Sequence, residues 1–206
     1  MNMGIIATSR LRQEIVAKYE FEETSGDAID QINNFNGVLS GNVIQGVSGF
    51  EGNAYSYDGV NGFVTIPNTI WNKLSQDRFT FQCYFNANVT NKGTIVSDLV
   101  GDSYTDRKLF IDLRDQNKIA VRIGNFTGSV GLNSVTTIDT NVWYKLKLKY
   151  DSSGSVKLFI NDSLEDTGDL TDRPTASNRI IIGAANTGSA SAVFNGKIDK
   201  VLFYNG

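Results

Sequence analysis

The sequence predicts an all-β protein, a two-sheet antiparallel β-sandwich of the jelly-roll type. Apolar and polar residues alternate along most of the chain, which is typical of strands with one buried face. Long helical periodicities are scarce, and glycine-containing turn signals separate the alternating segments. The chain has 20 glycines but only 2 prolines, so many tight turns with positive φ are expected.

Strand signals follow one another along the chain. Alternation is clearest at residues 79–85, 109–113, 119–123, 146–150 and 156–160. Weaker signals lie at residues 17–22, 54–58, 62–66, 94–99, 179–183 and 193–204. Short helical turns are indicated only at residues 11–18 and 69–75. About eleven short strands with no crossover helix between them pair antiparallel, and their apolar faces require two sheets packed on each other.

Length and composition favour one domain. The 206 residues, 40% hydrophobic and 20% charged, suffice for one full-sized sandwich or for two very small domains. Because no linker, repeat or low-complexity tract divides the chain, we expect one domain over residues 14–206, preceded by an arm at residues 1–13. Lys145, Lys147 and Lys149 alternate with apolar residues and form a row that suits a solvated sheet face.

Missing residue types exclude several functions. The chain contains no histidine, which removes Ser-His-Asp and Cys-His catalysis and the usual zinc sites. Cys83 is the single cysteine, so no internal disulfide can form, and its phase with Phe79, Phe81 and Phe85 indicates a buried side chain. The net charge of −3 and the lack of a basic run disfavour nucleic-acid binding.

The N-terminal sequence, MNMGIIATSR, does not read as a targeting signal. A signal peptide places its charge first and then a long apolar core, whereas here a four-residue apolar cluster precedes the arginines. No segment approaches the length of a membrane span. We therefore expect neither a signal peptide nor a membrane partner.

Three parts of the sequence resemble laminin G-like domains of the concanavalin A-like lectin/glucanase superfamily. The first is YEFEE at residues 19–23, followed by Gly26, Asp30 and Asn36-Gly37. The second is GFEGNAYSYDG at residues 49–59, leading to FVTIP at residues 63–67. The third comprises WYKLKLKYD at residues 143–151, LFIN at residues 158–161 and FNGKIDKVLFY at residues 194–204. These parts stand in the family's order, so the resemblance implies the β-sandwich fold.

The resemblance implies binding rather than catalysis. The family includes lectins, adhesion modules and structural domains. Some glycoside hydrolases of the same fold carry an E-x-D-x-x-E strand, whose carboxylates act as nucleophile and acid. No such motif occurs among the six glutamates, at positions 14, 20, 22, 23, 51 and 165, and the family's frequent W-H-H-V pattern has lost both histidines. We expect no catalytic residues; the alternative is a carbohydrate-active enzyme with displaced acids.

Asp199 is the most informative carboxylate, because both faces of its strand are apolar in sequence. A buried carboxylate needs a partner. Calcium takes six to eight oxygen ligands, and the resemblance implies one structural calcium ion held by side chains and backbone carbonyls at Asp199, Asp30, Glu22 and Gly52. The alternative without a metal is an ion pair with Lys18 or Lys200, or hydrogen bonds from backbone amides.

Four residues are candidates for contact with a sugar. Asp102 and Tyr104 lie in a loop that would offer carboxylate acceptors and a stacking ring, although a plain hairpin loop has the same composition. Trp71 lies in a second loop. Trp143 shares the parity of the lysine row, so it either stacks on a sugar or packs at the sheet edge, as the resembled family does. Asp58 is expected to cap its own turn.

The opening of the chain resembles the start of phage-encoded structural proteins. Ile5, Ile6 and Leu11 cannot join a closed sandwich, so we expect the arm to bind another virion or surface protein, or a symmetric copy of itself. The alternative is an arm that folds back onto its own domain.

These resemblances together imply a non-catalytic recognition or decoration module on a virion surface. Such a protein is made in the host cytoplasm, and its sandwich would face outward, where it could bind host or mucosal glycans. A lectin or carbohydrate-binding module on a bacterial cell surface is the alternative setting. Neither setting requires nucleic acid as a partner.

Overall fold

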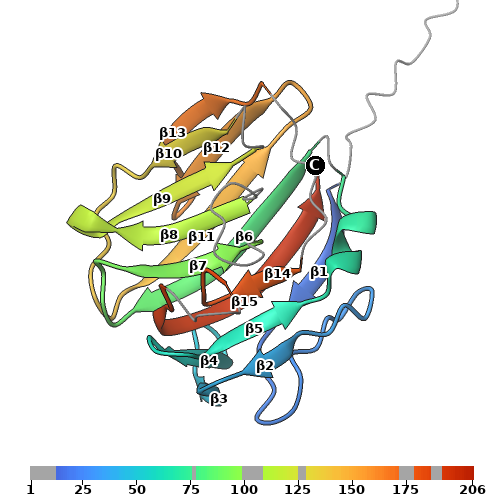
Figure 1. Cartoon of the computed structure of the whole chain (residues 1–206), viewed down its shortest axis with the longest axis vertical. Helices are drawn as coiled ribbons and strands as arrows, with labels where there is room; N and C mark the ends of the chain where they lie inside the picture. Colours follow the sequence, from blue (N-terminus) through green and yellow to red (C-terminus); the bar gives the residue numbers. More distant parts are fainter. Residues whose placement is uncertain (1–12, 76–77, 99–108, 125–128, 172–178, 187–191) are drawn as a thin grey trace, which may run out of the picture.

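The computed structural model describes residues 13–75, 78–98, 109–124, 129–171, 179–186 and 192–206 (Figure 1). In these residues the chain forms strands and two 3-10 turns, at Asn68–Asn72 and Asp115–Asn117. Two antiparallel sheets pack face to face, which confirms the predicted β-sandwich. No helix in the described part of the chain is long and apolar enough to cross a membrane.

The first sheet has eight strands. Seven follow one another in the spatial order β13 (Ser163–Asp169), β12 (Ser155–Ile160), β11 (Trp143–Tyr150), β6 (Phe79–Ala87), β15 (Asn195–Asn205), β4 (Asn53–Asp58) and β3 (Val43–Ser48). The eighth, β1 (Glu14–Tyr19), pairs with β15.

Strand β15 is the centre of the first sheet. One of its edges pairs with β6 along nearly its whole length. On the other edge, residues 195–198 pair with β4 and residues 201–205 pair with β1. The change of partner coincides with a bulge between Asp199 and Leu202, which leaves Asp199 and Lys200 between the two partner strands.

The second sheet has seven strands. Their spatial order is β10 (Val130–Asn133), β9 (Lys118–Ile123), β8 (Leu109–Arg114), β7 (Gly93–Ser97), β14 (Ile180–Ile182), β5 (Phe63–Ile66) and β2 (Val38–Ser40).

The core lies between the sheets and is filled by alternate residues of each strand. In β11, Tyr144, Leu146, Leu148 and Tyr150 are buried, while Trp143 and the three lysines of the row are half-buried on the outer face. Burying one large apolar side chain stabilises the fold by about 1.5–3 kcal/mol. The alternation in sequence thus marks the inner and outer faces of this strand correctly.

The structure corrects two expectations about the short segments. Trp71 is only 6% exposed and meets Phe79 edge-on, so it packs in the core and offers no stacking surface to a ligand. The 3-10 turn at Asn68–Asn72 buries its side chain there. Residues 14–18, expected as part of a helical turn, form strand β1, because pairing with β15 gives their apolar side chains a buried face. Cys83 is buried in β6, as its phase predicted.

Candidate functional site

Three aromatic side chains meet on the outer face of the first sheet: Phe50, Tyr84 and Trp143, called the aromatic cluster below. The rings of Phe50 and Tyr84 stack with their centroids 4.1 Å apart and their planes at 17°. Trp143 meets Phe50 edge-on, at 6.2 Å and 69°. Phe50 is 43% exposed and the other two are half-buried. The solvent-facing side of the sheet therefore carries an open aromatic surface.

The sheet order explains how these three rings meet. Tyr84 lies in β6 and pairs with Lys145 of β11, which places it on the same face as Trp143 two residues earlier. Phe50 belongs to the turn between β3 and β4. Since β15 lies between β4 and β6, this turn crosses the outer side of β15 to bring Phe50 onto Tyr84.

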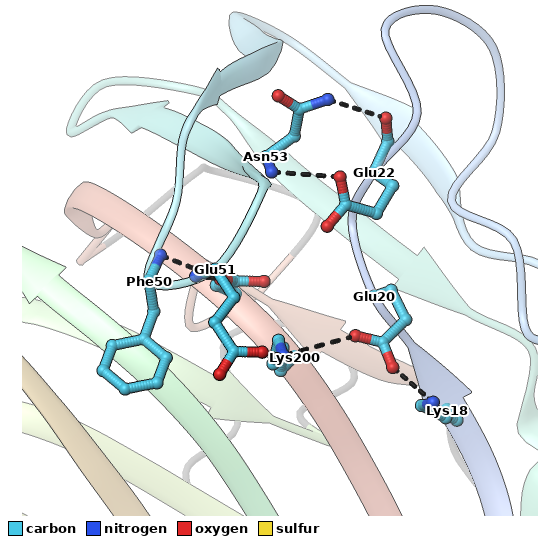
Figure 2. Close-up of polar contacts among 8 residues, drawn as sticks. Lys18, Glu20, Glu22, Phe50, Glu51, Asn53 and Lys200 are labelled. Carbon is cyan, nitrogen blue, oxygen red and sulfur yellow. Dashed lines mark hydrogen bonds and ion pairs between the residues drawn. The ribbon is translucent and has the colours of Figure 1, made fainter.

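Two carboxylates hold this turn in place (Figure 2). Asp199 Oδ2 accepts hydrogen bonds from the backbone N–H groups of Phe50, at 2.9 Å, and Glu51, at 3.3 Å. Glu22 Oε2 accepts one from the backbone N–H of Asn53 at 3.0 Å, and the Asn53 side chain donates to the Glu22 carbonyl. The position of the Phe50 ring is thus fixed by contacts to β15 and to the segment after β1.

Glycines leave room for both carboxylates. A Cβ atom at Gly49 would lie 2.9 Å from Asp199 Oδ2 and 2.4 Å from the backbone oxygen of Asn53. A Cβ atom at Gly52, whose φ is +65°, would lie 2.3 Å from Glu22 Oε1. The glycine spacing of the 49–52 turn is therefore a requirement of the turn's contacts with Asp199 and Glu22.

Lys200 lies at the bulge of β15, in a left-handed backbone conformation with φ of +48°. Its ammonium group pairs with Glu51 and lies 3.9 Å from Glu20, which also pairs with Lys18 (Figure 2). The contact with Glu51, together with the nearby negative charges, raises the pKa of Lys200 above its ordinary value. Lys200 thus joins the end of β1 to the β3–β4 turn, at the point of β15 that pairs with neither β1 nor β4.

Asp199 is fully buried, and its Oδ1 has no hydrogen-bond partner among the described residues. Burial raises the pKa of Asp199 to about 6, although the two backbone N–H groups act in the opposite direction. Of the two metal-free alternatives for Asp199, an ion pair or hydrogen bonds from backbone amides, the described residues show the hydrogen bonds.

The raised pKa of Asp199 makes stability depend on pH. Because an unfolded aspartate has a pKa of about 3.9, the folded state binds this proton more tightly. We expect its contribution to the free energy of unfolding to be fully present below about pH 4 and lost as the pH rises through about 6. The difference is on the order of 1–3 kcal/mol. Urea unfolding of the wild type and Asp199→Asn at matched pH values measures it; identical profiles for both proteins would contradict it.

The residues present do not fit the calcium ion that the family resemblance implied. Calcium needs six to eight oxygens, but Asp199 has only Oδ1 to offer and Glu22 Oε2 is engaged by Asn53. Both oxygens of Asp30 accept backbone N–H groups from its own loop and from Lys18. No group of three His, Cys, Asp or Glu side chains within the described ranges could hold a metal ion.

Lys200 gives two acids of this site a partner other than a divalent cation. Its ammonium group pairs with Glu51 and lies 3.9 Å from Glu20, which Lys18 also contacts. A cation that binds only the folded state raises the melting temperature by mass action. We therefore expect that, without such binding, neither calcium nor a chelator shifts the melting temperature of the wild type by more than about 1 °C. Differential scanning fluorimetry tests this, and a clear calcium-dependent rise would contradict it. In Lys200→Asn, which keeps a residue that tolerates positive φ, a calcium-dependent rise becomes possible.

The structure brings together some of the predicted residues and separates others. Asp199 and Glu22 hold the β3–β4 turn by hydrogen bonds, an arrangement called the clamp below, and Gly52 leaves room for Glu22 in it. Asp30 instead organises the loop after β1. Asp58 caps its own turn, as predicted, by accepting three backbone N–H groups. Asp102 and Tyr104, and the arm residues Ile5, Ile6 and Leu11, lie outside the described residues.

A model of the Laminin_G_3 family, described as the concanavalin A-like lectin/glucanases superfamily, matches residues 58–206 of the chain. The chain belongs to this family. The matched region contains the bulge of β15 and Trp143, while Phe50 precedes it. No curated protein matches this Laminin_G_3 domain in sequence.

Solved structures with the same fold include carbohydrate- and receptor-binding domains. Domain 4 of AbnA, a GH43 extracellular arabinanase from Geobacillus stearothermophilus in complex with arabinotriose, aligns with a TM-score of 0.72 at 20% identity, over 94% of this chain and 93% of that one. The receptor binding domain of botulinum neurotoxin C/D mosaic serotype aligns with a TM-score of 0.68 at 15% identity. It covers 93% of the Laminin_G_3 chain, which spans 48% of that toxin chain. At these identities the likeness shows the fold.

Proposed function

We propose that this Laminin_G_3 domain is a non-catalytic glycan-recognition module whose ligand lies against the aromatic cluster. The observation that supports this is the aromatic surface of Phe50, Tyr84 and Trp143 beside the lysine row of β11 on the outer sheet face. Pyranose and furanose rings have apolar C–H faces that pack on aromatic rings, while their hydroxyls need hydrogen-bonding groups at the edge. The outer face offers both.

The rigidity of Phe50 strengthens this proposal. An exposed aromatic side chain on a loose loop would lose conformational freedom when a ligand binds. Here the backbone of Phe50 is held by Asp199 and its ring by Tyr84, so the surface is formed before the ligand arrives. A related fold in complex with arabinotriose makes a short oligosaccharide a reasonable first ligand.

The absence of catalysis is part of the proposal. Glycosidases need two carboxylates flanking the scissile bond, one of them free to act as an acid. Five of the glutamates have structural roles. Glu20 and Glu51 pair with lysines. The other three accept hydrogen bonds: Glu22 from Asn53, Glu23 from Ile29 and Tyr55, and Glu165 from Thr136. We expect no release of reducing sugar from a panel of polysaccharides. Release that a single Asp or Glu substitution abolishes would contradict the proposal.

A glycan array probed with the purified protein, followed by calorimetric titration of any bound oligosaccharide, tests the binding function. A bound oligosaccharide that protects tryptophan fluorescence from quenching by acrylamide would place the ligand at Trp143, because Trp71, the other tryptophan, is buried. A protein that binds no glycan, neutral or acidic, contradicts the proposed function.

For the biological setting we propose a virion surface, with the module attached to another virion or surface protein through residues 1–13. The support is the resemblance of the opening sequence and the apolar residues Ile5, Ile6 and Leu11. Deleting residues 1–13 is expected to leave the melting temperature within a few degrees of the wild type but to prevent incorporation into particles or oligomers. A truncated protein that assembles normally would favour the bacterial cell-surface setting.

A further inference from the structure

We infer that the same outer face carries a second subsite, which binds a carboxylate or sulfate group of an acidic glycan. The inference rests on the proposed function and specifies the class of ligand. The subsite is a pocket of about 310 Å³ at the end of the first sheet, where Arg78 and Lys149 lie with Asp151, Asn205 and Gln13. Its volume is at the lower end of the range for small-ligand sites.

The pocket lies where several strands of the first sheet end together. In the sheet register, Phe79 of β6 pairs with Tyr150 of β11 on one side and with Asn205 of β15 on the other. Arg78 directly precedes β6 and Lys149 is the last lysine of the row on β11. Cations from two strands, far apart in sequence, therefore line one pocket.

The walls of the pocket are fixed by hydrogen bonds. Asn205 Oδ1 accepts from the backbone N–H of Ser75 at 2.7 Å, and its Nδ2 donates to the carbonyl of Lys73 at 2.9 Å. Gln13 Nε2 donates to the carbonyl of Gly206 at 2.7 Å. The two amides thus brace the pocket, and the cationic groups remain to meet a ligand.

A repulsive pair of lysines lies beside the pocket. Lys149 of β11 and Lys157 of β12 are direct cross-strand partners, and both are half-buried on the outer face. Like charges directly opposite each other in a sheet are destabilising. Such a pair is a cost to the fold that an anion bound between or beside the two ammonium groups would remove.

The neighbouring lysines of the row share a carboxylate partner. Lys145 and Lys147 both pair with Asp162, at 3.0 Å each. By contrast, no ion pair joins Arg78, Lys149 or Lys157 to a carboxylate in the part of the chain that the structure describes. The positive charge of the row is therefore unpaired at the pocket end.

Asp151 is the one side-chain carboxylate among the residues that line the pocket, and its own turn occupies it. Its Oδ1 accepts hydrogen bonds from the hydroxyl and backbone N–H of Ser153 and from the backbone N–H of Ser155. The bond from the Ser153 hydroxyl, aided by these N–H groups and nearby Lys157, lowers the pKa of Asp151. Arg78 and Lys149 in the wall, with Lys157 beside them, still outnumber Asp151 and the terminal carboxylate of Gly206, so the pocket region remains net positive.

The position of the pocket favours an extended glycan over a small anion alone. Tyr84 and Arg78 are six residues apart along one strand direction, which corresponds to about 20 Å. Trp143 and Lys149 lie toward opposite ends of β11 on the same face. An oligosaccharide of about six sugar units is long enough to stack on the aromatic cluster and place an acidic residue in the pocket. Nucleic acid is disfavoured because the chain as a whole carries a net charge of −3.

The test compares an acidic with a neutral hexasaccharide, each long enough to reach both subsites. We expect hexagalacturonate to bind the wild type more tightly than arabinohexaose does, with a preference that falls as salt rises because screening weakens charge pairing. In the Arg78→Gln and Lys149→Gln double variant, the Kd for hexagalacturonate should rise at least tenfold, while that for arabinohexaose changes less than twofold. Lys92→Gln, which removes one exposed lysine in the β6–β7 turn, is the matched control.

Each outcome decides between the proposals. If the wild type binds both sugars equally, or if the control variant weakens hexagalacturonate binding as much as the double variant does, the acidic subsite is wrong and the glycan-binding function stands. If neither sugar nor any arrayed glycan binds, the proposed function itself fails, and the subsite with it. Equal binding of an oligonucleotide or of anionic lipid vesicles would show a general attraction for polyanions and would also overturn the subsite. Unchanged far-UV circular dichroism of both variants keeps folding out of the comparison.

Discussion

Replacing both Phe50 and Trp143 with alanine is expected to reduce glycan affinity by about 100-fold while the sandwich stays folded. An aromatic ring that stacks on a ligand contributes on the order of 1–2 kcal/mol, which corresponds to about a 5- to 30-fold change in affinity for each ring. Phe50 is 43% exposed and Trp143 half-buried, so their removal leaves the core between the sheets untouched. Calorimetric titration with the best oligosaccharide from the array measures the effect.

The control for this experiment is a loss of exposed apolar surface elsewhere. Val135 is 75% exposed and lies in the segment after β10 of the second sheet, outside the aromatic cluster. Val135→Ala should therefore leave the Kd unchanged. Wild-type affinity in the double aromatic variant would rule out the aromatic cluster as the binding surface, although the chain would still have the Laminin_G_3 fold.

The Asp199→Ala variant is expected to lose about 2–4 kcal/mol of unfolding free energy near neutral pH. The substitution leaves the backbone N–H groups of Phe50 and Glu51 without their acceptor. A buried donor left unsatisfied costs about 1–3 kcal/mol. These two donors are partly buried, and part of the cost is returned because the buried, ionised carboxylate is itself unfavourable. Denaturant unfolding with an unchanged m-value would report this loss as a change in stability alone.

Two comparisons separate the clamp from a general effect of charge. Asp199→Asn keeps an acceptor oxygen for the turn, so we expect it to retain most of the stability that alanine loses. Asp162→Asn, which keeps a residue that tolerates the φ of +65° there, removes only exposed ion pairs with Lys145 and Lys147, and such pairs contribute about 0–1 kcal/mol. If Asp199→Ala costs no more than Asp162→Asn, the turn is not held by Asp199 as described.

Much of the fold could be predicted because the alternation in each strand is local. The two faces of β11 and the burial of Cys83 follow from sequence parity alone. Tyr84 could have been found in the same way, since it shares the outward parity of Thr80, Gln82 and Asn86, although Thr80 and Asn86 are themselves buried. Its partner Phe50 could not, because the turn's path across β15 depends on the order of strands in the sheet.

The bulge in β15 shows where parity fails. Lys197 and Phe203 have the same parity in sequence, yet Lys197 is half-buried outside while Phe203 lies in the core. The register shift between Asp199 and Leu202 reverses the two faces. The bulge adds one residue to β15 relative to β6, and no local sequence pattern predicts it. The contacts of Lys200 with Glu51 and Glu20 therefore depend on long-range strand pairing and could not be predicted from the sequence.

The central place of β15 has a consequence for the order of folding. The strand supplies Asp199 to a turn 149 residues earlier and pairs with β1, β4 and β6. Contacts over such separations make folding slow, and they leave the edges of the earlier strands unpaired until the last strand arrives. During synthesis, the polypeptide up to residue 194 would hold neither the aromatic surface nor the basic pocket in shape. Recognition is therefore a property that the nascent chain acquires in one late step.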